Sequence, residues 1–256
     1  MSLQNATGTI TVSIDAKIAT IEFGHPASNS FPSTQLQLLT DTLSELNKNK
    51  NITLIVLKSS GEGAFCAGAS FDELLEVSNL EEGNRFFSGF ANVINAMRKS
   101  NKIIIGRIHG KAVGGGVGLM AACDYVFGTE KVAVKLSELA IGIGPFVIEP
   151  AVSKKIGRTS MSELTLAATE WKSAQWAFEK GLISKLFSST EEMDIALLQF
   201  IKQLSSYNPE ALYEMKKVIW QGTEDWDHLL YERAAISGRL VLSDFTKNAL
   251  NQFKKS

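Results

Sequence analysis

Two glycine-rich turns constrain the folding of this 256-residue chain more than any other feature. The first spans Gly61–Ser70 and follows the apolar, β-branched segment Ile52–Lys58. The second spans His109–Gly118 and follows the similar segment Ile103–Ile108. A glycine turn that leaves a strand can present backbone N–H groups to a ligand without obstruction by side chains. Two such turns can direct two N–H groups at one oxygen atom, which is the geometry of an oxyanion hole.

Glu138 lies downstream of the second turn and is the candidate acid/base for such a site. Its neighbours Leu136, Leu139 and Ile141 are apolar, so the side chain is placed for partial burial. Burial raises the pKa of a carboxyl group toward the range that is useful for proton transfer. The residues alone also allow an exposed glutamate that follows a short strand.

Other glycine-based chemistries do not fit the spacing. Gly106–Ala112 has three residues where a phosphate-binding P-loop has four, and it ends in alanine where a hydroxyl must reach magnesium. Gly114, Gly116 and Gly118 are spaced by two, unlike a dinucleotide fingerprint. No GxSxG nucleophile motif occurs, and the two cysteines and three histidines form no cluster with metal-ligand spacing.

Cys66 and His109 lie inside the turns and are candidates for chemistry of their own. We expect Cys66 to fill a tight loop as a small apolar side chain, because no neighbouring residue supplies a base. His109 belongs to no motif, so we expect a structural role.

The bulk composition is that of an ordinary soluble protein, with 45% hydrophobic and 21% charged residues. The net charge of −1 offers no basic field for nucleic acid. The amino-terminal residues lack the pattern of a secretory signal, and no segment reaches the about 20 apolar residues of a membrane span. We therefore expect a cytoplasmic protein without nucleic-acid or membrane partners.

The order of predicted elements indicates an α/β fold. Strands alternate with helices up to about Ser160, and the rest of the chain is mostly helical. The predicted strands are 9–14, 17–23, 52–58, 103–108, 125–127, 132–134 and 183–187, and the predicted helices are 33–47, 81–99, 114–123, 173–180, 190–205, 209–220, 226–242 and 246–254.

Several segments in order resemble the enoyl-CoA hydratase/isomerase (crotonase) superfamily. The main ones are Ala64–Ala69, Gly110–Gly116, and Ser137-Glu138 followed by Gly142–Pro145. Weaker similarities lie at 25–29, 122–124 and 180–183, so the resemblance covers nearly the whole chain.

The resemblance implies a spiral of ββα units and an enzyme that acts on acyl-CoA thioesters. It divides the chain into an acyl-CoA-binding core, residues 1–190, and a helical oligomerisation region, residues 191–256. It also implies a homotrimer or a dimer of trimers. Coenzyme A is then part of the substrate, and no separate cofactor is expected.

The resemblance assigns roles to individual residues. The backbone N–H groups of Ala69 and Gly115 are the implied oxyanion donors, and Glu138 is the implied catalytic acid/base. The implied substrate-binding residues flank the two turns: Ala67, Gly68, Ser70, Asp72, Gly114 and Gly116.

The chain also departs from the family pattern. Hydratases of the family carry a second glutamate where this chain has Gly118, and Glu149 is a possible replacement. Asp72 and Gly63 stand where many hydratases have lysines that contact CoA, which leaves Lys254 or Lys255 as candidate phosphate contacts.

These departures keep three functions open. The family resemblance predicts hydration of a 2-enoyl-CoA, including a branched substrate similar to methylglutaconyl-CoA. A single glutamate suits a Δ3,Δ2-enoyl-CoA isomerase, which moves one proton along the acyl chain. The third alternative is an acyl-CoA-binding scaffold that has lost catalysis.

Overall fold

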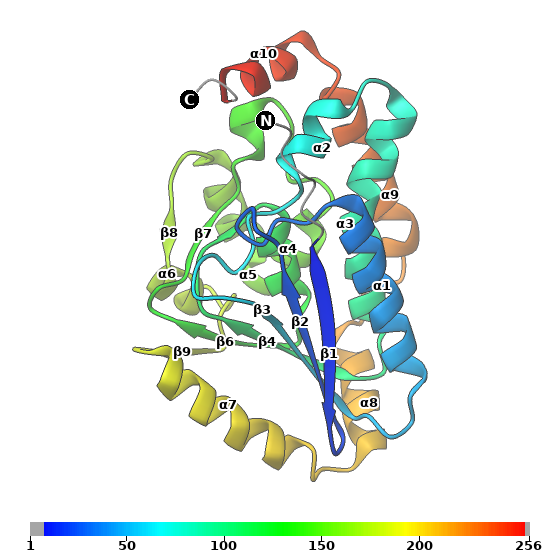
Figure 1. Cartoon of the computed structure of the whole chain (residues 1–256), viewed down its shortest axis with the longest axis vertical. Coiled ribbons are helices and arrows are strands. Elements are labelled where there is room, and N and C mark those ends of the chain that lie inside the picture. Colours follow the sequence, from blue (N-terminus) through cyan, green and yellow to red (C-terminus); the bar gives the residue numbers. More distant parts are fainter. Residues whose placement is uncertain (1–7, 254–256) are drawn as a thin grey trace.

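The computed structural model describes residues 8–253, and its main element is a six-stranded sheet (Figure 1). The strand order is β1-β2-β3-β4-β6-β9. β1 and β2 form an antiparallel hairpin, and the remaining neighbours are parallel. The bounds are β1 Thr9–Asp15, β2 Ile18–Gly24, β3 Leu54–Ser59, β4 Ile103–Ile108, β6 Tyr125–Thr129 and β9 Lys185–Phe187.

The parallel strands are buried on both faces, which explains their nearly continuous apolar sequences. In β3, Ile55 and Leu57 face the main core under helices α1 (Ser33–Lys48), α3 (Leu80–Lys99) and α4 (Gly115–Ala122). The alternate residues Leu54 and Val56 face α7 (Thr190–Leu204) across the sheet. Figure 1 shows α7 on the opposite side of the sheet from α1 and α3.

A second, three-stranded sheet positions the glycine turns. Its order is β5-β7-β8, with bounds β5 Ala112–Val113, β7 Ala133–Lys135 and β8 Lys172–Ser173. β5 is parallel to β7, and β7 is antiparallel to β8.

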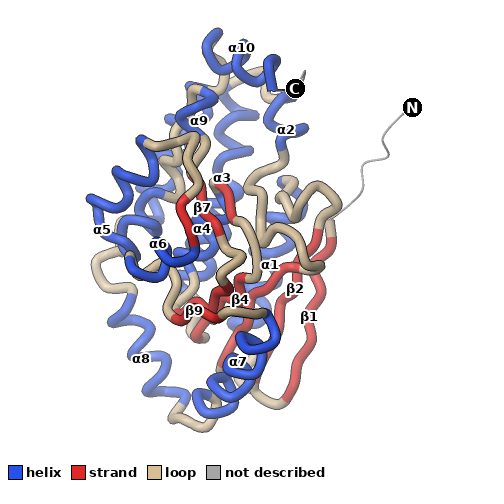
Figure 2. Tube along the Cα trace, turned by 90° about the vertical axis from the view of Figure 1, so that its left-hand side faces the viewer, coloured by secondary structure: helices blue, strands red, loops and turns tan. Residues whose placement is uncertain are grey.

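The last two helices lie at the same end of the molecule as α2 (Phe71–Glu76), as Figures 1 and 2 show. α9 (Trp226–Leu240) packs along α3, where Gly83 and Gly238 let the two backbones approach closely. α10 (Asp244–Phe253) packs against the 3₁₀ helix η1 (Glu138–Ile141). The remaining helices are α5 Glu149–Leu166, α6 Ala174–Glu179 and α8 Pro209–Ile219.

The α/β fold and most of the predicted elements are confirmed, with ends that differ by a few residues. Helices α2 and α5 were not predicted. Ser33 is the first residue of α1, and the N-cap residue Pro32 makes no side-chain capping hydrogen bond. The N–H and hydroxyl groups of Ser33 both donate to Glu73 Oε2 on α2, at 2.8 and 2.6 Å. A carboxylate from another helix therefore satisfies the start of α1.

Two further sequence predictions concern the chain ends and membranes. Lys254 and Lys255, the candidate phosphate contacts, lie outside the described residues. Within residues 8–253, none of the helices combines the length and the apolar character that crossing a bilayer requires.

Candidate active site

The two glycine turns lie against each other, held by backbone hydrogen bonds. The N–H of Phe65 donates to the carbonyl of Lys111 at 2.8 Å, and the N–H of Val113 donates to that of Cys66 at 2.9 Å. The first turn thus pairs with the strand that enters the second. Two loops that are far apart in sequence become one surface.

Glycine is required at this junction for two different reasons. Gly68 and Gly114 have φ values of +91° and +51°, which residues with a side chain rarely adopt. Gly115 has no room for a side chain, because the ring of Phe90 on α3 covers its Cα. A Cβ built on Gly68 would lie 3.5 Å from the Gly115 nitrogen, which shows how close the turns are.

The predicted oxyanion donors have free N–H groups at this junction. Neither Ala69 nor Gly115 donates a hydrogen bond to any partner within residues 8–253. Gly115 is the first residue of α4, where unpaired N–H groups and the helix dipole both favour a negative oxygen. Both residues line the same cavity.

Strand β7 brings Glu138 to this cavity. Val113 of β5 is in register with Lys135 of β7, and the Gly114 N–H donates to the Lys135 carbonyl at 3.0 Å. Three residues later the chain turns through η1, which is closed by Gly142 at φ +83°. The carboxyl group then lies over Gly114, so that a Cβ built there would be 2.7 Å from Glu138 Oε1.

Burial changes the acidity of the Glu138 carboxyl group. Its Oε2 atom is inaccessible to solvent and has no hydrogen-bond partner among the described residues. Desolvation of the charged form raises the pKa of Glu138 to about 7, against a smaller lowering by a backbone hydrogen bond. Near neutral pH the group therefore exists in both protonation states, as an acid/base requires.

The cavity beside Glu138 measures about 150 Å³ and is mainly apolar. Its side-chain polar groups, among the residues that the structure describes, are Glu138 and the hydroxyls of Ser137 and Ser237. The Ser237 hydroxyl donates to the Gly144 carbonyl at 3.4 Å. The apolar part of the lining comes from α2, α3, β5, η1 and the segment after η1: Phe71, Leu74, Phe86, Phe87, Phe90, Val113, Ile141, Ile143, Pro145, Val147 and Ile148.

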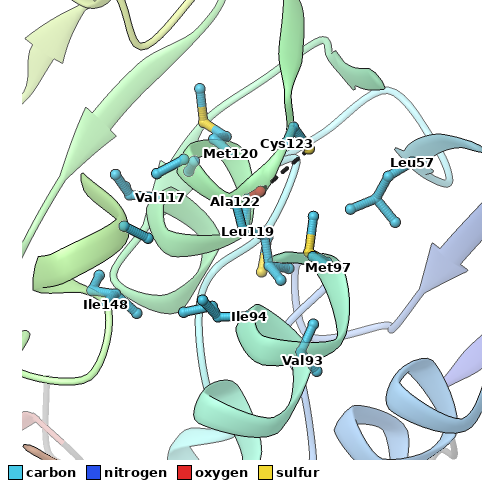
Figure 3. Close-up of a cluster of buried hydrophobic side chains, with 14 of the residues drawn as sticks. Leu57, Val93, Ile94, Met97, Val117, Leu119, Met120, Ala122, Cys123 and Ile148 are labelled. Atoms are coloured by element: carbon cyan, nitrogen blue, oxygen red, sulfur yellow. Dashed lines mark hydrogen bonds between the residues drawn. The ribbon is translucent and has the colours of Figure 1, made fainter. Parts of the chain in front are cut away.

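Gly118, the position of the second glutamate in family hydratases, is closed by Ile148. A Cβ built on Gly118 would lie 2.5 Å from Ile148 Cγ2 and 3.7 Å from Ile94 Cδ1. Figure 3 shows the Ile148 side chain beside α4, near Val117 and Ile94. No side chain fits at Gly118 while Ile148 keeps this position.

The other predicted substrate-binding residues divide into two groups. Ala67, Gly68 and Gly114 line the cavity. Ser70, Asp72 and Gly116 lie outside its lining: Ser70 caps α2 by accepting a hydrogen bond from the Glu73 N–H, Asp72 is exposed, and Gly116 packs on the Cys66 carbonyl.

Glu149, the candidate second acid, does not face Glu138. It is the first residue of α5 and accepts a hydrogen bond from Ser153 at 2.6 Å. Its other oxygen lies 4.0 Å from Arg233. Glu149 lines a separate hollow together with Phe146 and Arg233, while Ile148 next to it lines the cavity.

Cys66 and His109 are both buried in structural settings. Burial raises the pKa of the Cys66 thiol to about 12, so the nucleophilic thiolate is not formed near neutral pH. Burial and the neighbouring Arg107 lower the pKa of His109. Arg107 itself forms a two-bond ion pair with Asp194 of α7 at 2.6 and 2.8 Å.

The likeness to a known family extends over almost the whole chain. The model of the family described as enoyl-CoA hydratase/isomerase matches residues 13–249. The chain belongs to this family. This match confirms the family resemblance that the ordered motifs indicated.

Curated relatives of this enoyl-CoA hydratase/isomerase family member carry different names. A short-chain-enoyl-CoA hydratase from Clostridium acetobutylicum is 25% identical and covers 93% of this chain and 92% of its own. A peroxisomal Δ(3,5)-Δ(2,4)-dienoyl-CoA isomerase from Arabidopsis thaliana is 27% identical, and the match covers 71% of this chain and 69% of the isomerase. A mitochondrial methylglutaconyl-CoA hydratase from Rattus norvegicus is 30% identical, and the match covers 77% of this chain and 63% of the hydratase.

Solved structures of the family share the fold. The crystal structure of an enoyl-CoA hydratase from Bacillus halodurans superposes with a TM-score of 0.87. It is 20% identical and covers 95% of this chain and 99% of that chain. At this identity the similarity demonstrates the architecture.

Sequence reasoning missed part of the cavity wall of this family member. Ile148 and Ser237 both line the cavity, but they come from the start of α5 and from α9. Ile148 is an apolar residue beside the acid Glu149, and nothing in the local sequence marks it as a cavity residue. Ser237 is 99 residues beyond Glu138 in the chain, and no local pattern marks it.

Proposed function

We propose that this protein is a Δ3,Δ2-enoyl-CoA isomerase that acts on a thioester with an uncharged acyl chain. The observation that supports this most directly is a single carboxyl with a buried Oε2 atom and a pKa raised to about 7, on a cavity that is otherwise mainly apolar. Two unpaired N–H groups line the same cavity. One carboxyl and an oxyanion site are sufficient for a 1,3-proton transfer.

The proposed reaction begins with the thioester oxygen accepting hydrogen bonds from the N–H groups of Ala69 and Gly115. The ionised Glu138 then removes a proton from Cα of the 3-enoyl thioester, and the negative charge develops on the thioester oxygen. The same carboxyl returns the proton to Cγ. The double bond moves from Cβ=Cγ to Cα=Cβ, and Glu138 is again ionised. The net change is the movement of one hydrogen, with no oxidant or water consumed.

The apolar lining supports a substrate of limited size and without charge on the acyl group. Apolar cavities of about 150 Å³ can hold a group the size of benzene. No lysine or arginine within residues 8–253 lines the cavity. The distal carboxylate of a methylglutaconyl-CoA-like substrate would be desolvated without a partner, which is costly. We therefore favour a short, apolar acyl chain.

Hydration of a 2-enoyl-CoA is the second candidate. The relatives named as hydratases favour it, and a single glutamate can activate water and then return the proton. The two reactions are separated by supplying 3-hexenoyl-CoA and crotonyl-CoA to the same enzyme. Isomerisation gives a conjugated thioester, whereas hydration gives a 3-hydroxyacyl-CoA, and chromatography distinguishes them. Efficient turnover of crotonyl-CoA with none of 3-hexenoyl-CoA would contradict our proposal.

The Glu138→Gln variant tests whether the protein is an enzyme or a scaffold. Glutamine keeps the shape of the side chain but cannot take up the Cα proton. We expect kcat for isomerisation to fall by about 10²–10⁴-fold, the usual worth of general acid–base catalysis. Calorimetry with a saturated acyl-CoA should show unchanged binding. A wild-type protein that binds acyl-CoA and turns over none of the enoyl thioesters is the result that a scaffold predicts.

A further inference from the structure

The segment between η1 and α5 forms one wall of the cavity, and Ile148 is the last residue of this segment. Val147 and Ile148 are both buried, and both line the cavity together with Pro145. Ile148 also packs over Gly118 of α4, where a Cβ would lie 2.5 Å from its Cγ2 atom. Figure 3 shows Ile148 beside the apolar side chains of Val117 and Ile94.

Because of this packing, few polar side chains lie where they could bind a water molecule near the acyl chain. A buried water requires about two to four polar partners. Apart from Glu138, the side-chain candidates within the described residues are Ser137 and Ser237, and Ser237 already donates to the Gly144 carbonyl. The N–H groups of Ala69 and Gly115 are assigned to the thioester oxygen in the proposed function. Apart from Glu138 and these two serines, the side chains of the lining are hydrocarbon.

We propose that Ile148 is a specificity-determining residue that directs the enzyme to proton transfer and prevents water addition. This inference rests on the proposed function and extends it. Hydration forms a C–O bond at Cβ and a C–H bond at Cα, both from one water molecule, and breaks the C=C π bond. That reaction needs a held water and a group that accepts its proton. Ile148 occupies the wall position where such a group would stand.

The place of Ile148 in the fold makes it a practical site for substitution. It is the N-cap residue of α5, and its side chain makes no capping hydrogen bond. A negative charge at the start of a helix is stabilised by the free N–H groups and the helix dipole. This interaction offsets part of the desolvation cost that a carboxylate would meet at this buried position.

The test compares Ile148→Glu with Ile148→Gln, which differ in charge but hardly in size. Both variants are supplied with 3-hexenoyl-CoA and 2-hexenoyl-CoA, and the isomerised and hydrated products are separated by chromatography. We expect Ile148→Glu to raise the ratio of hydration to isomerisation about 100-fold over wild type, in line with the gain from an added general base. Ile148→Gln should change that ratio much less.

A second pair of variants covers the case in which Ile148→Glu does not fold. Ile148→Ser opens the space over Gly118 and adds a hydroxyl that can hold water, whereas Val147→Ala enlarges the same wall and leaves Gly118 covered. The ratio should rise in Ile148→Ser and stay near wild type in Val147→Ala.

The outcomes separate the two proposals. A folded Ile148→Glu that isomerises and hydrates no faster than Ile148→Gln overturns the inference about Ile148 and leaves the isomerase proposal intact. Equal ratios of hydration to isomerisation in Ile148→Ser and Val147→Ala would likewise overturn the inference about Ile148 and leave the isomerase proposal intact. A wild-type enzyme that isomerises none of the 3-enoyl thioesters overturns the proposed function itself.

Discussion

The acidity of Glu138 follows from its position above Gly114, where Oε2 has lost water and gained no donor within the described part of the chain. The proposed reaction starts from the ionised carboxyl, and the pKa of Glu138 is raised to about 7. We expect kcat/KM for isomerisation to fall about tenfold for each pH unit below this pKa, because only the ionised fraction reacts. A pH–rate profile with 3-hexenoyl-CoA measures this, and a profile that is flat down to about pH 5 would contradict it.

The same carboxyl makes the fold less stable as the pH rises. Its pKa is about 7 in the folded chain and near the ordinary glutamate value of 4.5 when unfolded, so the folded state binds more protons between these values. Stability is therefore lost as the pH increases through this window. Glu138→Gln removes the charge, and we expect it to stabilise the protein at pH 8 by on the order of 2 kcal/mol and by almost nothing near pH 4.5. Urea unfolding of both proteins at the two pH values is the measurement.

At the level of elements, the contact between α4 and the first turn depends on a missing side chain. A Cβ on Gly116 would lie 2.5 Å from the Cys66 carbonyl oxygen, which is backbone and cannot move aside. We expect Gly116→Ala to destabilise the fold by about 1–3 kcal/mol, as overpacking does. Gly63→Ala is the matched control, because nothing lies within 4 Å of its Cβ position. Equal urea unfolding midpoints for Gly116→Ala and Gly63→Ala would contradict this prediction, because they would show that the first turn moves to make room for the methyl group.

The elements that sequence analysis predicted well are those with a strong period and a buried face. Strands β3 and β4 and helices α1 and α3 carry continuous or amphipathic apolar patterns, and their positions agree closely with prediction. α5 escaped prediction because Gly157, at φ +75°, interrupts it and divides its pattern. α2 is only six residues long, too short for a period to show.

The residues of the candidate site also divide into those that the sequence predicted and those that it did not. Ala69, Gly115 and Glu138 share one cavity, as the order of the motifs predicted, and their roles remain predictions. Ile148 could not be predicted, because an apolar residue before an acid carries no local sign that it faces a cavity. The sequence shows which residues can do chemistry more readily than which residues exclude water from it.

At the scale of the whole molecule, a buried ion pair fastens the carboxy-terminal helices to the sheet. Lys216 of α8 lies 2.8 Å from Asp124, and both side chains are almost fully buried. Asp124 also accepts hydrogen bonds from the Ile104 N–H and the Trp220 indole, at 2.7 and 2.6 Å. The network therefore joins β4 to α8 and to the turn that follows it.

Removing one partner of this pair leaves the other charge buried. We expect Lys216→Met to lower the free energy of unfolding by about 3–5 kcal/mol. Lys217→Met, which removes the neighbouring exposed pair with Glu214, should cost between about 0 and 1 kcal/mol. The double variant Asp124→Asn/Lys216→Met should recover part of the loss, because it removes both charges of the pair. A loss in Lys216→Met no larger than that in Lys217→Met would show that water reaches the pair.

The oligomeric state of this protein remains a prediction: we expect a homotrimer or a dimer of trimers. Trp220 and Trp226 pack against each other inside the chain, whereas Phe245 on α10 is 66% exposed. The ring of Phe245 also lies against Gly142, which closes the turn that carries Glu138. If a neighbouring subunit covers Phe245, assembly and catalysis are coupled through this contact.

We therefore expect Phe245→Glu to dissociate the assembly and to lower isomerase activity together, because a charge cannot be buried at an apolar contact without a partner. Leu198→Glu is the matched control: Leu198 is 63% exposed on α7, at the other end of the long axis in Figure 1. Light scattering after size-exclusion chromatography gives the mass, and the 3-hexenoyl-CoA assay gives the activity. A wild-type protein that elutes as a monomer would contradict the predicted assembly, and a dissociated Phe245→Glu with full activity would remove the coupling.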